Sequence, residues 1–234
     1  MFYQTLSRFY DVVFPQNPAA VHFVLRHLPA QATVADAACG TGTMAIALAQ
    51  AGMNCTAVDI EPEMVRQARQ KDTQEIVDFR VGDMRDIASW GTFDGILCLG
   101  NSLSHLASRE QLQQFFVDSG RALRPSGRCV FQIVNYDRIL DRPEGVDLPT
   151  LGNAEVIFHR RYIPTQDGSI QFRSCLQAEG RTWEHSIALQ PILSADFRTM
   201  LRDAGFAVEL FGDYGGAPFD KQSSFSLIAV GDIG

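Results

Sequence analysis

The chain has 234 residues, which is enough for one α/β domain with a sizeable core. Apolar residues make up 46% and charged residues 20%, as is typical of a folded protein. Its formal net charge of −7, without a Lys- or Arg-rich run, argues against nucleic acid or an anionic membrane as the main partner. No apolar run reaches the roughly 18 residues of a membrane helix, and the first residues lack a secretion-signal pattern, so we expect a cytoplasmic protein.

The cysteines and histidines are dispersed along the chain. There are five of each, and no pair has the spacing of a metal site or a redox motif. This pattern predicts buried thiols in a reducing compartment and no metal site.

Two helices are predicted ahead of the first strand. Residues 3–14 carry aromatic side chains at 3, 9, 10 and 14, and residues 18–28 form a second helical segment. We expect residues 1–30 to form a helical cover over the mouth of the sheet that follows.

Short apolar strands then alternate with helices. The predicted strands are 33–36, 55–58, 77–81, 93–99 and 129–134, and the predicted helices are 43–51, 62–71 and 110–123. Such alternation is typical of a parallel sheet covered on both faces.

The pattern changes after residue 135. Residues 135–153 are predicted to be a loop, and three strands without intervening helices follow at 154–163, 170–178 and 182–189. We interpret 154–190 as an inserted antiparallel sheet that forms part of the substrate site. A helix at 194–204 and strands at 208–211 and 225–230 predict a closing hairpin. The expected fold is α/β, with a doubly wound, mostly parallel seven-stranded sheet in a single domain, 1–234.

A Gly-rich turn follows the first strand. Gly40 and Gly42 allow a ligand to approach the backbone closely, and the next helix presents unpaired N–H groups. The pattern Gly40-x-Gly42-x-x-Ala45 also fits a dinucleotide-binding fingerprint, so the turn alone leaves both cofactor classes open.

Three further polar elements follow the next three strands. Asp59 ends the second strand, where a carboxylate can accept ribose hydroxyls or can start the next helix. Gly82-Asp83-Met84 follows the third strand and suits an adenine ring or a simple surface loop. Residues 99–105 follow the fourth. In a doubly wound sheet all of these lie at one edge, where ligands bind.

These segments resemble the motifs of class I S-adenosylmethionine-dependent methyltransferases. Residues 34–42 read VADAACGTG, 57–64 read AVDIEPEM, 82–86 read GDMRD, 93–102 read FDGILCLGNS and 123–128 read LRPSGR. Residues 98–106 and the inserted sheet are similar to the glycine N-methyltransferase and aminosugar N-methyltransferase groups. The chain departs at Ala38, where the family usually has its first glycine, and at Arg128, where many members have a second glycine.

The resemblance implies a Rossmann-like fold, S-adenosylmethionine as cofactor and a role for individual residues. Asp36, Ala38 and Gly40 would line its methionine part and Asp59 its ribose. The residues implied for the adenine end and the cofactor cover are Ile60 (against the adenine), Asp83 and Met84 (holding the adenine), Leu99 (backbone near the amino group), and Tyr3 and Tyr10 (aromatics closing over the cofactor). Helix packing is the alternative for the two tyrosines.

His105 and Asn101 are the candidates for catalysis. Methyl transfer from a sulfonium needs alignment above all, and a base only when the acceptor arrives protonated. His105, just past the fourth strand, is placed to be that base, and Asn101 to orient an acceptor. A structural histidine and an Asn that caps the following turn are the alternatives.

The acceptor is expected between the helical cover and the inserted sheet. One of Arg160, Arg161 and Arg173 could pair with a substrate carboxylate, whereas solvated strand faces explain at least two of them. Tyr214 could line the rim of this pocket or belong to a simple hairpin loop.

The leading hypothesis is therefore a methyltransferase acting on a small-molecule acceptor at nitrogen or oxygen. A non-catalytic S-adenosylmethionine-binding protein shares every cofactor residue, and a NAD(P)-dependent oxidoreductase would share the Gly-rich turn. The acceptor and the oligomeric state stay open.

Overall fold

A computed structural model describes the backbone of residues 2–233 and the side chains of residues 5–233. Its larger sheet has seven strands. From edge to edge these are β11 (Phe206–Phe211), β12 (Ser226–Ile233), β5 (Leu123–Val134), β4 (Phe93–Cys98), β1 (Thr33–Ala37), β2 (Asn54–Asp59) and β3 (Val77–Val81). Only β12 among them runs antiparallel to its neighbours, β5 and β11. The predicted doubly wound, mostly parallel sheet and its closing hairpin are confirmed.

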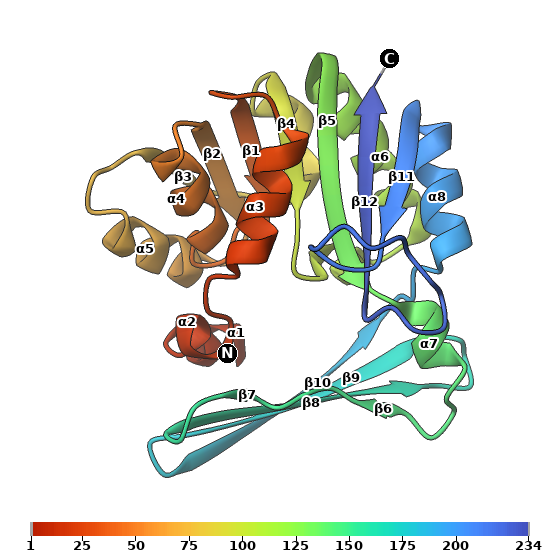
Figure 1. Cartoon of the computed structure of the whole chain (residues 1–234). Helices are drawn as coiled ribbons and strands as arrows, with labels where there is room; N and C mark the ends of the chain where they lie inside the picture. Colours follow the sequence, from red (N-terminus) through yellow and green to blue (C-terminus); the bar gives the residue numbers. More distant parts are fainter. Residues whose placement is uncertain (1, 234) are drawn as a thin grey trace.

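Helices cover both faces of this sheet (Figure 1). One face packs against α3 (Pro18–His27), α4 (Thr43–Gln50) and α5 (Pro62–Lys71), and the other against η1 (Met84–Ser89), α6 (Arg109–Ala122) and α8 (Ser194–Asp203). Consecutive residues of β5, Val130 and Phe131, point into these two opposite apolar clusters. Because both faces of the large sheet are covered, its central strands are apolar along their length and do not alternate between apolar and polar residues.

A second, antiparallel sheet lies below the carboxyl ends of the parallel strands (Figure 1). Its strands are β6 (Val146–Asp147), β7 (Leu151–Gly152), β8 (Val156–Pro164), β9 (Ile170–Ala178) and β10 (Arg181–Leu189). The long strands β8, β9 and β10 match the three strands predicted there within two residues. The smaller sheet thus faces the edge at which the predicted ligand-binding elements end.

The N-terminal segment differs from the prediction. The expected single helix at 3–14 is divided into α1 (Phe2–Ser7) and α2 (Tyr10–Val13), because Phe9 leaves the helical conformation with φ −114° and ψ 6°. This break lets Phe9 and Val13 pack on Phe158 and Leu176 of the smaller sheet. Tertiary packing here overrides the local helical preference.

One loop prediction is also wrong. The segment 135–153 contains α7 (Tyr136–Leu140), whose first turn is capped because the Asn135 side chain accepts from the Arg138 N–H, and it contains β6 and β7. Residues after β4 form a short 3₁₀ helix, η2 (Ser102–His105). Within residues 2–233, no helix has the length and apolar character needed to cross a membrane.

Candidate active site

The turn after β1 is held in a left-handed conformation. Ala38, Gly40 and Gly42 have φ values of +63°, +56° and +72°. A Cβ on Gly42 would lie 2.4 Å from the ring of Phe79, so only glycine fits at that position. Gly40 and Gly42 therefore let the chain double back tightly into the first turn of α4, as the sequence predicted. Ala38 adopts the same backbone conformation with the steric cost of a side chain.

Asp59 holds this turn from the end of β2. Its Oδ2 accepts from the Gly40 N–H at 2.8 Å, and its Oδ1 accepts from the Glu61 N–H at 2.9 Å. The carboxylate therefore fixes the Gly-rich turn and also satisfies the N–H of Glu61, where α5 begins, and its predicted role toward a ribose stays a prediction. The side chain of Glu61 itself makes no cap.

Asp36 is buried beside it on β1. Its side chain is 3% exposed, and its Oδ2 has no hydrogen-bond partner among the described residues. Burial, and next the charge of Asp59, raise the pKa of Asp36 to about 7. An unpaired buried carboxylate oxygen is costly, and a cationic ligand group at this point would lower that cost.

The outer end of the same edge combines apolar and acidic groups. Ile60 is 67% exposed, unusually open for a large apolar side chain. Asp83 accepts from the Arg85 N–H at 2.9 Å and from its guanidinium at 2.6 Å, which lowers the pKa of Asp83. Met84 is half-buried, with its Sδ 4.0 Å from Cys98 Sγ.

The segment after β4 brings Leu99, Asn101 and His105 to the edge. Asn101 Oδ1 accepts from the Val134 N–H at 2.9 Å and its Nδ2 donates to Tyr136 Oη at 2.9 Å. Its side chain thus holds this loop against β5 and α7, and its predicted role toward an acceptor stays a prediction. Burial, and next the charge of His185, lower the pKa of His105.

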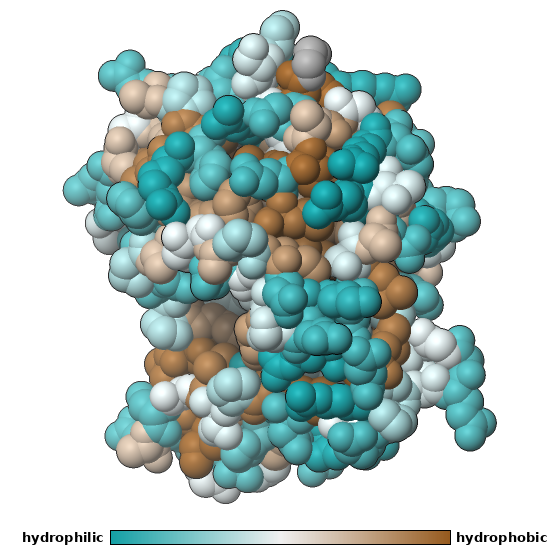
Figure 2. All heavy atoms as spheres, turned by 45° about the vertical axis from the view of Figure 1, so that its right-hand side comes forward, coloured by the Kyte–Doolittle hydropathy of each residue, from teal (hydrophilic) through white to brown (hydrophobic). Residues whose placement is uncertain are grey.

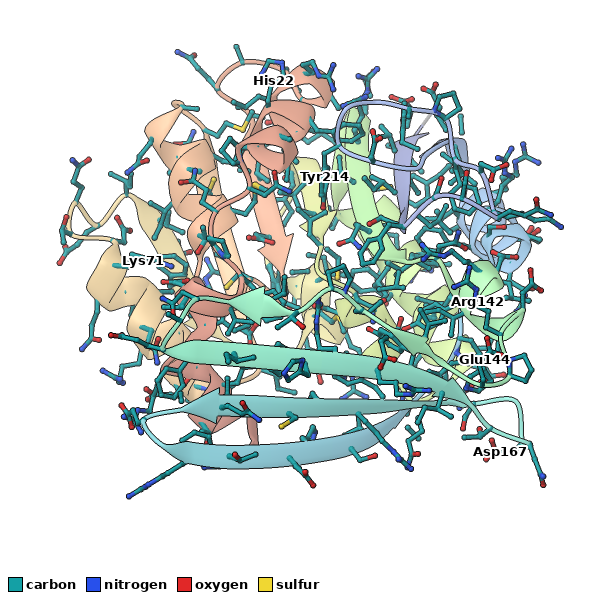
Figure 3. All side chains as sticks on the ribbon, turned by 60° about the horizontal axis from the view of Figure 1, so that its bottom comes forward. His22, Lys71, Arg142, Glu144, Asp167 and Tyr214 are labelled. Carbon is teal, nitrogen blue, oxygen red and sulfur yellow. The ribbon has the colours of Figure 1, made fainter. Side chains whose placement is uncertain are left out.

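The helix α2 lies directly over the turn. A Cβ on Gly40 would lie 3.3 Å from the ring of Tyr10, so the two are in contact. Asp11 Oδ1 accepts from Thr41 Oγ1 at 2.5 Å, and Lys71 Nζ donates to Asp11 Oδ2 at 2.7 Å. Figure 3 shows Lys71 on α5, on the side of the molecule where α1 and α2 lie. The side chain of Tyr3, also predicted here, is outside the described residues.

Tyr214 approaches from the loop between β11 and β12 (Figure 3). It is half-buried, with its ring 5.7 Å from that of Phe23. Burial, and next the charge of Asp36, raise the pKa of its hydroxyl. Tyr214 thus packs against the apolar cluster that contains Phe23, and its predicted place at the pocket rim stays a prediction. In residues 5–233 no three His, Cys, Asp or Glu side chains gather as a metal site.

Known proteins with this arrangement are methyltransferases. Residues 34–127, from β1 to the start of β5, match the methyltransferase domain family. A glycine/sarcosine N-methyltransferase of Halorhodospira halochloris is 34% identical over 206 residues, which cover 83% of this chain and 73% of that protein. The chain belongs to the S-adenosylmethionine-dependent methyltransferases.

Other members of the family align over a smaller share. A ubiquinone biosynthesis O-methyltransferase of Xanthomonas axonopodis is 30% identical over 140 residues, 55% of this chain and 57% of that protein. A methyltransferase of Bacillus subtilis is 31% identical over 145 residues, 60% of this chain and 59% of the relative. The chain therefore spans less than two thirds of the length of these two curated relatives.

Solved methyltransferases share the whole fold. An S-adenosylmethionine-dependent methyltransferase from Clostridium acetobutylicum superposes with a TM-score of 0.83 at 17% identity, over 100% of both chains. The CcbJ methyltransferase from Streptomyces caelestis gives 0.82 at 18% identity, over 98% of this chain and 96% of that one. Both comparisons extend beyond the large sheet to the smaller one.

The sequence motifs of the methyltransferase family missed one part of this site. Asp11 and Lys71 lie outside every motif, and they meet Thr41 of the Gly-rich turn only because α2 folds back over that turn. The sequence pointed to this cluster only through Asp11, an acidic residue within an aromatic-rich helical segment. Tyr10 was predicted as an aromatic residue of the N-terminal cover, and Tyr214 as a residue of either the pocket rim or a simple hairpin loop.

Proposed function

We propose that this protein transfers the methyl group of S-adenosylmethionine to a small-molecule acceptor, at nitrogen or oxygen. The observation that carries the proposal is Asp36, whose buried Oδ2 has no partner beside the Gly-rich turn. A carboxylate at this position suits the ammonium group of a methionine moiety. The ammonium pairs with the carboxylate and donates hydrogen bonds in place of those from water that burial has removed.

The remaining residues fit the rest of the cofactor. Ala38 and Gly40 lie where the backbone can approach its methionine part, and Asp59, although it already accepts two N–H groups, keeps lone pairs for ribose hydroxyls. The groups we assign to the other parts are Ile60 against the adenine, Asp83 and Met84 at the adenine edge, the Leu99 backbone near the amino group, and Tyr10 as a cover. Exposed Ile60 would then bury apolar surface on binding.

The chemistry needs alignment and a destination for one proton. A bound S-adenosylmethionine would supply an activated methyl group, with the sulfur, as a neutral thioether, as the leaving group. His105 accepts the proton that the acceptor nitrogen or oxygen loses, because its lowered pKa keeps the imidazole neutral near pH 7. Asn101 positions the loop that carries His105 through its bonds to Val134 and Tyr136.

The surroundings of the site suit a small acceptor. Figure 2 shows a hollow between the body of the molecule and the smaller sheet, with apolar side chains in its depth. We propose that the chain, 1–234, works as one domain in which the N-terminal cover and the strands of 154–190 enclose the acceptor. The H. halochloris relative is named an N-methyltransferase and the X. axonopodis relative an O-methyltransferase, which supports these two acceptor atoms. All five cysteines are free thiols, which supports a cytoplasmic location.

Isothermal titration with S-adenosylmethionine and S-adenosylhomocysteine tests the cofactor assignment. We expect both to bind the wild-type protein, and Asp36→Asn to weaken the binding of S-adenosylmethionine by at least about tenfold. Asp78→Asn, an exposed aspartate on β3, is the matched control and leaves binding unchanged. Absence of binding at millimolar concentration contradicts the proposal, and titration of NAD(H) instead would favour an oxidoreductase.

Turnover separates an enzyme from a binding protein. The production of S-adenosylhomocysteine is followed with a library of small amines and alcohols. Production with at least one acceptor supports a methyltransferase. Cofactor binding with no turnover of any metabolite fraction supports a non-catalytic binding protein instead.

A further inference from the structure

The two faces of the smaller sheet differ in character. Along β8, β9 and β10, alternate side chains point toward the body of the molecule, and on this inner face Phe158, Tyr162 and Leu176 are buried. The outer face carries exposed side chains, among them His159 and Arg173. The inner face is the one that packs against the N-terminal helices.

A hollow of about 580 Å³ adjoins this sheet. Its lining combines outer-face residues, among them His159 and Arg173, with Arg160, Ser174 and His185, which share the face of Phe158 and Leu176. The inner-face members of this lining are the ones on the side of the N-terminal helices.

One row of polar residues interrupts the apolar inner face. Arg160 on β8 lies directly opposite Ser174 on β9, which lies directly opposite His185 on β10. Ser174 is only 4% exposed. Arg160 Nε and Ser174 Oγ are buried and have no hydrogen-bond partner among the described residues. Two adjacent unsatisfied donors in an otherwise apolar face are costly to folding and indicate a ligand group that accepts from them.

This row begins beside the helical cover of the cofactor turn. The guanidinium carbon of Arg160 lies 5.7 Å from the centre of the Phe14 ring, and the Phe14 ring lies 4.9 Å from that of Tyr10, which contacts Gly40. A molecule seated on the row therefore lies next to the residues that cover the methyl-donor turn.

Arg160 is held in place by its other contacts. Its Nη2 donates to the Pro149 carbonyl at 3.1 Å, and its guanidinium lies over the rings of Phe14 and Phe158. Neither contact brings a negative charge, and the ion pairs of the described residues leave Arg160 without a carboxylate, whereas Arg161 pairs with Asp147. Arg160 is thus an oriented cation with unused hydrogen-bonding capacity in a half-buried setting.

We infer that the methyl acceptor carries a carboxylate, which accepts hydrogen bonds from Arg160 and Ser174 while the nucleophilic atom points toward His105. The inference rests on the proposed function and adds the chemical class of its acceptor. A guanidinium and a hydroxyl are both donors here, and a carboxylate offers the lone pairs that match them, often as a paired contact with arginine. An amide offers one weaker acceptor, and an acceptor that is only cationic is repelled.

A panel of paired acceptors tests this assignment. Each member is an α-, β- or aromatic amino or hydroxy acid, supplied once as the free carboxylate and once as the primary carboxamide, with S-adenosylhomocysteine production as the readout. We expect turnover of carboxylate members and at least about a tenfold lower kcat/KM for their amides. Equal turnover of amides and carboxylates overturns the inference, and so does a failure of every carboxylate while S-adenosylhomocysteine still binds.

Variants of the row locate the effect. Arg160→Gln is expected to raise the KM for the carboxylate at least about tenfold with a smaller change in kcat, to remove the preference over the amide, and to leave S-adenosylhomocysteine binding intact. Arg160→Lys keeps the charge and should retain part of the preference. Arg173→Gln, on the outer face of the same sheet, is the matched control and leaves KM unchanged.

Each result has one meaning. An unchanged carboxylate preference in Arg160→Gln, with circular dichroism and melting temperature like those of Arg173→Gln, overturns the inference. Loss of S-adenosylmethionine binding by the wild-type protein would instead contradict the proposed function, so the two failures are distinguishable.

Discussion

Asp36 lies beside Asp59 on the neighbouring strand, and the second carboxylate adds to the effect of burial in raising the pKa of the first to about 7. The pKa of Asp59 is also raised, chiefly by burial, although N–H groups of Gly40 and Glu61 partly offset this. The two acids at the cofactor end of the sheet thus oppose each other's ionisation. A ligand that brings positive charge offsets this repulsion. The pair of acids therefore lowers the stability of the ligand-free protein and favours the binding of a cationic ligand.

The first prediction concerns stability and pH. In the unfolded chain Asp36 releases its proton near pH 3.9, whereas in the folded protein it keeps the proton to about pH 7. The folded state therefore binds more protons in this window, and the free energy of unfolding falls as the pH rises from about 4 to about 7. One pKa unit corresponds to about 1.4 kcal/mol, so the fall from Asp36 is at most ~4 kcal/mol.

Asp36→Asn removes this titration and keeps the shape of the side chain. In urea titrations at pH 5 and pH 8, we expect the variant to lose less stability between the two pH values than the wild-type protein does. Asp78→Asn should show the wild-type dependence, because Asp78 is exposed and pairs with Arg80. An identical pH dependence in Asp36→Asn and wild type would mean that Asp36 ionises normally in the folded protein.

The sequence predicted the large sheet well because its signals are local. Apolar strands such as 129–134 and the glycines at 40 and 42 act through neighbouring residues, and the structure confirms them. The division of the helix at 3–14 was missed because it depends on partners distant in sequence, such as Phe158 for Phe9. The helix Tyr136–Leu140 was also missed, although its cap, Asn135, is adjacent in sequence. The polar row beginning at Arg160 could be predicted only in part. Strand alternation predicts that the side chain of one arginine points inward, but it does not predict which residue of the neighbouring strand lies opposite, which is Ser174.

The second prediction concerns the ion pair between α2 and α5. Lys71 Nζ contacts Asp11 Oδ2 and also donates to Thr43 Oγ1 at 2.8 Å, so it joins the N-terminal cover to the Gly-rich turn. We expect Lys71→Gln to speed the dissociation of S-adenosylmethionine several-fold while lowering the free energy of unfolding by less than about 1 kcal/mol, since the pair is partly exposed.

Stopped-flow measurement of cofactor release and hydrogen exchange in residues 5–14 check this. Arg66→Gln is the control, because Arg66 lies on the same helix but forms its ion pair with Glu63 rather than with a residue of α2. Equal release rates and equal exchange in Lys71→Gln and Arg66→Gln would show that the ion pair does not hold the cover.

The third prediction compares two substitutions of opposite sign in one turn. Ala38 pays the cost of a side chain at φ +63°, so Ala38→Gly should raise the free energy of unfolding by about 1 kcal/mol. Gly42→Ala introduces a Cβ 2.4 Å from the Phe79 ring at φ +72° and should lower it by at least about 2 kcal/mol. Urea unfolding at constant pH measures both. A stabilised Gly42→Ala, or a destabilised Ala38→Gly, would contradict the geometry of the turn.

The last prediction concerns His105 as the proton acceptor. Burial, and next His185, lower its pKa below the ordinary value of about 6.5, so kcat/KM for a hydroxyl acceptor should rise with pH along an acidic limb and level off once the imidazole is neutral. His105→Gln should lose about 100-fold in kcat/KM at pH 7 and should lose the acidic limb of the profile, with cofactor binding retained. His159→Gln, on the outer face of the smaller sheet, is the control and should keep the wild-type profile. A purely structural His105 would lower activity and leave the shape of the pH profile unchanged, which is the result that would exclude it as the base.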